Sequence, residues 1–129
     1  MDKAQALDGF WSGFGWPAFN EQGNYDELSA ADLGIEDRYI LYEVQTGDYT
    51  SEIALTAQLF HRSVSEETVS RKAQEIADFI GFGGKVLPID GGWLWIKRGN
   101  PFSQPLRDES DPDWRRTIIN ISVDFLTAT

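Results

Sequence analysis

The pattern of hydrophobic and polar positions predicts a strand followed by one amphipathic helix in the middle of the chain. Within residues 53–60 the apolar side chains of Ile53, Leu55, Ala57 and Leu59 recur at every second position. A period of two is typical of a strand with one buried face. From residue 69 the period becomes helical, with an apolar stripe made of Val69, Ala73, Ile76, Ala77 and Ile80. We expect this long helix to cover the strands.

The ends of this helix carry recognisable signals. Ser65 suits the N-cap, with Glu66 and Glu67 in the first turn, where the helix dipole favours negative charge. Ser63 paired with Glu66 is a competing capping box, so two starting positions remain open. Gly81 stands where a left-handed C-cap is expected.

Further alternating stretches predict a sheet built from hairpins. Residues 38–46 are rich in aromatic and β-branched side chains, and Gly47-Asp48 should turn them back onto 53–60 as an antiparallel hairpin. A second hairpin is expected from 85–89 and 93–98 around Asp90-Gly91-Gly92. Residues 116–126 alternate throughout and predict the longest strand, which closes the chain.

The remaining segments carry weaker patterns. Residues 2–11 predict a short helix that glycines prevent from extending, and 16–19 predict a brief extended segment, at a sheet edge or in no strand because of Pro17. Residues 21–36 read as loop with one helical turn at 29–33. Residues 100–114 hold three prolines and an acidic run, which predicts a long solvated loop.

These elements predict an α+β fold in a single domain that spans residues 1–129. In it, a mostly antiparallel sheet of four to five strands packs against one long helix, with a weak N-terminal helix beside them.

Composition and charge exclude several classes of function. The 129 residues include no cysteine, which excludes disulfides, cysteine zinc sites and thiol chemistry. No apolar run is long enough to span a membrane, and the N-terminus lacks the features of a signal peptide, so we expect synthesis in a cytoplasm. The net charge of −10 disfavours nucleic-acid binding. It suits either plain solubility or an acidic passage along which DNA slides without sticking.

Candidate chemistry is sparse. His61, the only histidine, is expected to be structural, and one histidine without cysteine predicts no transition-metal site. Residues 81–85 superficially resemble a phosphate loop but lack its spacing and its Ser or Thr after the lysine. The carboxylates within 108–113 lack the spacing of a calcium loop. We expect no catalytic residues, metal or cofactor, and a protein that is not an enzyme.

The aromatic residues are more informative. Trp93 and Trp95 alternate with Leu94 and Ile96, so if the aliphatic pair faces the core, the tryptophans face outward. Exposed tryptophans favour interfaces. Alternatively, the N-terminal segment or the long loop covers this second face.

The order of these segments resembles the small tail terminator and minor capsid proteins of long-tailed bacteriophages and prophages. The likeness covers the N-terminal stub before residues 16–19, the hairpin, the helix start at 63–67, and the polar loop with its closing strand. It implies a non-enzymatic subunit of a homohexameric ring that caps the tail tube and joins it to the head. The implied place is the tail or neck of the virion, after synthesis in the host bacterial cytoplasm.

The resemblance implies three kinds of partner: further copies of the chain, the tail tube protein, and head–tail connector proteins. It implies neither sequence-specific nucleic-acid binding nor a membrane. The candidate contact residues are Trp93, Trp95, Asn100, Phe102 and Trp114. Alternatives are a head–tail connector (neck) protein, a host-encoded binding module and, with less support, a small acid/base hydrolase.

Overall fold

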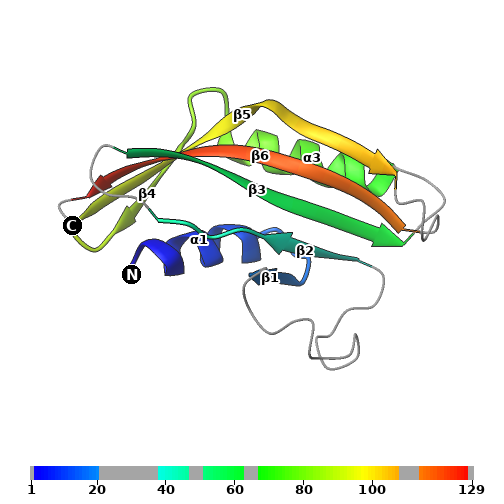
Figure 1. Ribbon diagram of the computed structural model, residues 1–129, viewed down its shortest axis with the longest axis horizontal. Coiled ribbons are helices and arrows are strands. Elements are labelled where there is room, and N and C mark those ends of the chain that lie inside the picture. Colours follow the sequence, from blue (N-terminus) through cyan, green and yellow to red (C-terminus); the bar gives the residue numbers. More distant parts are fainter. Residues whose placement is uncertain (1, 21–37, 47–50, 63–66, 108–113, 128–129) are drawn as a thin grey trace.

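The computed structural model describes residues 2–20, 38–46, 51–62, 67–107 and 114–127 (Figure 1). The described ranges contain two helices and six strands. In order they are α1 (Lys3–Ser12), β1 (Ala18–Asn20), β2 (Arg38–Tyr42), β3 (Ser51–Arg62), α3 (Glu67–Ile80), β4 (Lys85–Ile89), β5 (Gly92–Arg107) and β6 (Trp114–Thr127). No helix in these ranges is long and apolar enough to cross a membrane.

The strands form one sheet in the order β1-β2-β3-β6-β5-β4. Long antiparallel pairings of β3 with β6 and of β6 with β5 make its centre, and the long strands curl along their length (Figure 1). Both predicted hairpin pairings are confirmed: β2 with β3, and β4 with β5. The short β1 runs parallel to β2 at one end of the order, and at the other end β4 contains Pro88.

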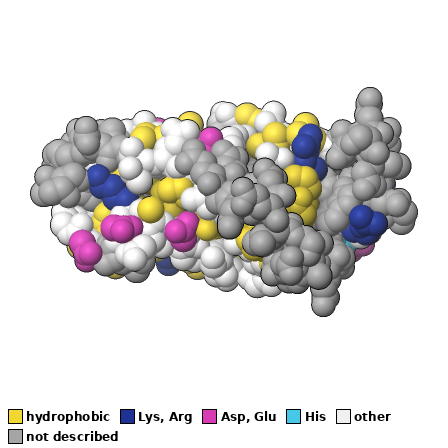
Figure 2. Space-filling model, turned by 60° about the horizontal axis from the view of Figure 1, so that its bottom comes forward, with side chains coloured by type: hydrophobic (Ala, Val, Ile, Leu, Met, Phe, Trp, Pro, Cys, Tyr) yellow, Lys and Arg dark blue, Asp and Glu magenta, His cyan; other side chains and the backbone are white. Residues whose placement is uncertain are grey.

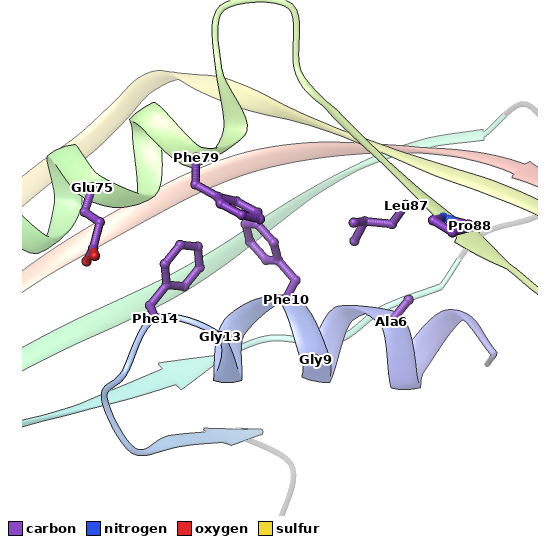
Figure 3. A pocket seen from close by; sticks show the side chains of 9 residues that line it. All are labelled: Ala6, Gly9, Phe10, Gly13, Phe14, Glu75, Phe79, Leu87 and Pro88. Atoms are coloured by element: carbon purple, nitrogen blue, oxygen red, sulfur yellow. The ribbon is translucent and has the colours of Figure 1, made fainter.

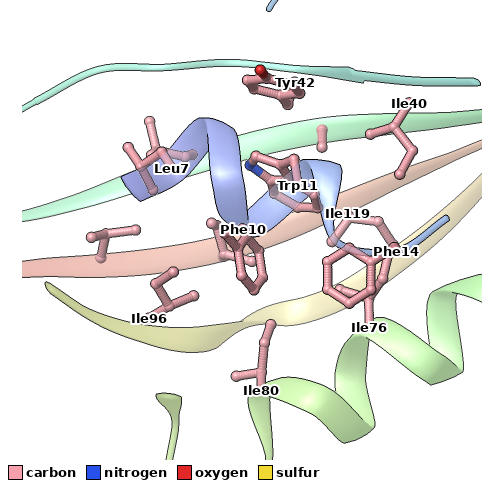
Figure 4. Packing of buried hydrophobic residues seen from close by; sticks show 14 of the residues in the cluster. Leu7, Phe10, Trp11, Phe14, Ile40, Tyr42, Ile76, Ile80, Ile96 and Ile119 are labelled. Carbon is pink, nitrogen blue, oxygen red and sulfur yellow. The ribbon is translucent and has the colours of Figure 1, made fainter. Parts of the chain in front are cut away.

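One face of this sheet and both helices bury a single hydrophobic core. Fully buried side chains come from every layer, including Trp11 of α1, Ile76 of α3, and Leu55 and Ile121 of the central strands. Figure 4 shows Ile76 and Ile80 on α3 pointing toward the segment that carries Phe10 and Phe14. We call this side of the sheet the core face, and the opposite side the outer face.

Helix α1 is better defined than its sequence pattern suggests. Asp2 forms a capping box: its Oδ1 accepts a hydrogen bond of 2.8 Å from the Gln5 backbone N–H, while Gln5 Oε1 accepts one of 2.9 Å from the Asp2 N–H. The indole of Trp11 stacks on the Tyr42 ring at 6.2 Å between centroids. The cap and these buried contacts hold a helix that glycine would otherwise weaken.

The predicted face of the long helix is confirmed. The buried residues of α3 are Val69, Ala73, Ile76, Ala77 and Ile80. Gly81 ends the helix with a φ of 77°, and its N–H donates to the Ala77 carbonyl at 2.9 Å. The two candidate N-caps, Ser63 and Ser65, lie outside the described residues.

The predicted fold class is wrong. Instead of four to five mostly antiparallel strands on one long helix, the described residues form a curled, mixed sheet of six strands with two helices, and more than half of these residues lie in strands. One extra strand comes from the edge segment with Pro17, whose carbonyl accepts a 2.7 Å hydrogen bond from the Ile40 N–H. The second helix, α1, places four buried side chains in the core, so α3 does not cover the sheet alone.

The predicted loop at 100–114 is also wrong for residues 100–107, because β5 continues to Arg107 along β6. Residues 108–113 lie outside the described residues. A bulge between Arg98 and Ser103 absorbs the irregular residues, and the Asn120 side chain donates a 2.9 Å hydrogen bond to the Pro101 carbonyl across it. Beyond Ile96, β5 has no β4 residue paired with it. The prolines in this part of β5 therefore interrupt no hydrogen-bond ladder with β4.

Candidate functional site

The structure separates the predicted contact residues into two groups on β5. Trp93 and Trp95 lie near its start, whereas Asn100 and Phe102 lie in the bulge. A strand of seven residues spans roughly 23 Å, so the two groups cannot form one compact site. Trp114 opens β6, and its side chain lies outside the described part of the structure.

Trp93 is exposed on the outer face together with aliphatic neighbours. Its exposed fraction is 52%, and Val86 and Leu126 are 50% and 37% exposed. Trp93 pairs with Leu126 across β5 and β6, and Val86 pairs with Trp95 across β4 and β5. We call the three exposed side chains, Val86, Trp93 and Leu126, the outer patch. Leu94, next to Trp93, is fully buried on the core face, as its alternation predicts.

Trp95 faces the same way but is held by its own chain. Its Nε1 donates a 3.0 Å hydrogen bond to the Gly83 carbonyl, and the Lys97 ammonium lies 4.7 Å from a ring centroid. A Cβ added at Gly84 would lie 2.4 Å from the same Nε1, so the indole packs directly on this glycine. The main role of Trp95 is therefore to fasten the turn between α3 and β4.

The bulge residues differ in what they offer to a partner. Phe102 is half-buried and packs against the hydrophobic core, beside Ala73 and Ala77 of α3. Its ring is thus part of the molecule's own packing. Asn100 is exposed.

A polar group occupies the middle of the outer face. Lys97 bridges Asp124 at 3.0 Å and Glu52 at 3.4 Å, and Ser122 Oγ donates to Glu52 at 2.7 Å. The Ser122 hydrogen bond and then Lys97 lower the pKa of Glu52, while the bond to Asp124 raises the pKa of Lys97. These pairs fix the alignment of β3, β6 and β5 beside the outer patch.

An apolar pocket lies between the two helices and β4 (Figure 3). Its volume is about 380 Å³, and Phe10, Phe14 and Phe79 supply its aromatic walls. Phe79 meets Phe14 edge to face at 5.5 Å and is still 48% exposed. The remaining lining residues are Ala6, Gly9, Gly13, Glu75, Leu87 and Pro88. We call this the aromatic pocket.

The sequence pattern did not reveal the aromatic pocket. Gly9 and Gly13 are spaced by four residues and therefore share one side of the chain at α1, which is the signal that was available. Its walls, however, come from three segments far apart in the sequence.

Figure 2 shows that hydrophobic side chains reach the surface among acidic ones on the side of the molecule that was lowest in Figure 1.

The buried titratable groups have packing partners. His61 is buried, with its ring 6.1 Å from that of Trp16. The Tyr42 hydroxyl donates to Asp8 at 2.8 Å, and burial together with this bond raises the pKa of Tyr42. Within the described ranges no group of three or more histidine or acidic residues could hold a metal ion. The acidic residues at 108–113 lie outside those ranges.

Comparison with known proteins finds a similar fold. No family model and no curated protein matches the chain. Five chains of solved structures match it. One of them is similar over 95% of this chain and 87% of its own length, with a TM-score of 0.58 and 12% sequence identity. At this identity the likeness shows the fold alone.

Proposed function

We propose that the chain is a non-enzymatic virion subunit, a tail terminator or minor capsid protein that forms a ring on the phage tail. The outer patch carries this proposal. Val86, Trp93 and Leu126 expose apolar surface from three adjacent strands. Apolar groups gathered on a protein surface, tryptophan above all, favour protein–protein contact. The choice of a tail terminator rests on the resemblance of the N-terminal stub, the hairpin and the start of the long helix to that family.

The mechanism is capping by surface complementarity. The ring docks through its outer patches on the last ring of the tail tube, and the occupied tube end accepts no further tube subunits. The charge of −10 on each chain gives the ring a strongly negative field. Such a field repels phosphates, so DNA passes through the lumen without binding.

The test is native mass spectrometry with electron microscopy, on the chain alone and with tail tube protein from the same genome. We expect closed rings that bind tube ends and stop tube growth. Trp93→Ser should abolish binding to the tube and leave the fold intact, because Trp93 is half-exposed. Thr56 is exposed on β3 and lies outside the outer patch, so Thr56→Ser is the matched control and should cap like the unmodified chain.

Two results would contradict the proposal. Rings that bind a head vertex and ignore tube ends would assign the chain to the head–tail connectors. If Trp93→Ser still caps tubes, the outer patch is not the surface that contacts the tube.

A further inference from the structure

Phe82 is fully exposed at the turn between α3 and β4. The turn that carries it is nonetheless held at three points. The Gly81 N–H donates to Ala77 at 2.9 Å, the Gly84 N–H donates to Gly81 at 3.3 Å, and Trp95 Nε1 donates to Gly83 at 3.0 Å. The turn therefore presents a phenyl ring to the solvent from a backbone that is already ordered.

A fully exposed phenyl ring contributes nothing to the packing of its own chain. It is, however, well suited to binding, because the cost of ordering its backbone is met before a partner arrives. Rigid aromatic side chains are also the commonest anchors in protein–protein contacts.

The aromatic pocket on the same chain has matching chemistry. Its volume of about 380 Å³ lies within the range of pockets that enclose small organic groups. The walls from Phe10, Phe14 and Phe79 offer both ring faces and ring edges, which suits a further aromatic ring. Among the described residues that line it, Glu75 alone is charged, and it forms an ion pair with Lys72.

Part of the pocket is open because two of its lining residues at α1, Gly9 and Gly13, carry no side chain. A Cβ added at Gly9 would meet no atom within 4 Å, and one added at Gly13 would meet only backbone oxygens at 3.5 Å. Phe82 does not fill this space in its own chain, since its ring is fully exposed.

We infer that Phe82 of one copy inserts into the aromatic pocket of a second copy of this chain. The knob and the pocket are different surfaces, so a copy that gives its knob to one neighbour and its pocket to another makes a head-to-tail contact. A head-to-tail contact closes into a ring when its rotation divides a full turn. The inference rests on the proposed ring and deepens it by naming the contact between neighbouring subunits.

Two variants separate the knob from the pocket. Phe82→Ser removes the ring from a residue that touches nothing else in the chain. Gly9→Leu places a side chain in the pocket from a position with free space around it. Gly83→Ser on the same turn and Ser12→Leu on the same helix are the matched controls, and both positions are exposed.

Native mass spectrometry and sedimentation measure the assembly, and circular dichroism with thermal melting checks the fold. We expect Phe82→Ser and Gly9→Leu each to weaken self-association by more than about tenfold, as loss of a buried aromatic anchor does. Both controls should assemble like the unmodified chain. An equimolar mixture of the two variants should form one-to-one dimers and nothing larger, because only one knob and one pocket remain compatible.

The outcomes separate this contact from the proposed function. Rings that form equally well with Phe82→Ser would overturn the contact and leave the ring in place. If the unmodified chain forms only dimers, and Phe82→Ser is monomeric, the contact is supported and the ring is contradicted. An unmodified chain that stays monomeric at every concentration would overturn both. If Gly9→Leu melts early, Phe82→Ser decides alone, since its side chain is fully exposed.

Discussion

At Gly99 in the β5 bulge, an added Cβ would lie 2.7 Å from the carbonyl oxygen of Asn120. At Gly9 on α1, an added Cβ would meet no atom within 4 Å. The first glycine permits two backbones to approach closely. The second merely leaves a helix without a side chain that would favour it.

The same substitution should therefore have opposite effects at the two positions. Gly99→Ala should lower the free energy of unfolding by about 1–3 kcal/mol, because the methyl group forces the bulge away from β6. Gly9→Ala should raise it by about 0.5–1 kcal/mol, because alanine loses less conformational freedom in a helix. Both changes in the free energy of unfolding are measured from the midpoints of urea unfolding, provided that the m-value stays constant. Equal signs would mean that the bulge does not approach Asn120 as described.

At the scale of elements, α3 has its polar and apolar residues sharply divided. Ile76 is fully buried in the core, whereas the neighbouring Glu75 side chain is 55% exposed and pairs with Lys72. Burial of each large aliphatic side chain contributes about 1.5–3 kcal/mol, while an exposed ion pair contributes little.

Substitutions at these adjacent positions should differ widely in cost. Ile76→Asp should lower the free energy of unfolding by more than about 4 kcal/mol, because it buries an unpaired charge and removes apolar contacts. Glu75→Ala should change it by less than about 0.5 kcal/mol. Thermal melts followed by circular dichroism compare the two. Similar losses would show that the buried face of α3 has been misassigned.

The elements that the sequence predicts well are those whose pattern is local. The stripe on α3 and the alternation in β6 need only neighbouring residues, and the hairpin around Asp90-Gly91-Gly92 needs only a short turn. The N-terminal helix is expected from the sequence, but the fold class fails because the place of α1 in the core and the second half of β5 depend on distant partners. Trp11 becomes a core residue by stacking on Tyr42, and the bulge is stable because Asn120 spans it. Neither contact leaves a periodic signal.

The candidate site could be predicted only in part for the same reason. The outward direction of Trp93 follows from alternation with Leu94, and the structure places it on the surface. That Trp95 binds the Gly83 carbonyl, and that Phe102 packs into the core, depends on turn and bulge geometry. The aromatic pocket joins three segments, so no single stretch of sequence marks it.

At the scale of the whole molecule, electrostatic repulsion opposes assembly. Each chain carries a net charge of −10, so neighbouring subunits in the proposed ring would repel one another. The outer patch and the aromatic pocket are apolar, and salt leaves such contacts largely intact. Screening should therefore act on the repulsion alone.

Ring formation should strengthen as ionic strength rises. Between about 0.01 M and 0.15 M salt the screening length falls from roughly 30 Å to 8 Å, which removes most of the repulsion between neighbouring chains. Sedimentation velocity at constant protein concentration would show the shift toward larger species. Assembly that weakens with salt would indicate that opposite charges hold the subunits together instead.

The two outermost strands of the sheet have a further consequence. β1 is only three residues long, and in β4 the imide nitrogen of Pro88 has no hydrogen to donate. Short strands and prolines at such positions block the main-chain pairing through which sheets grow into fibrils. The edges that β1 and β4 present should therefore have little tendency to add a strand from another copy, which would suit the crowded ring proposed above.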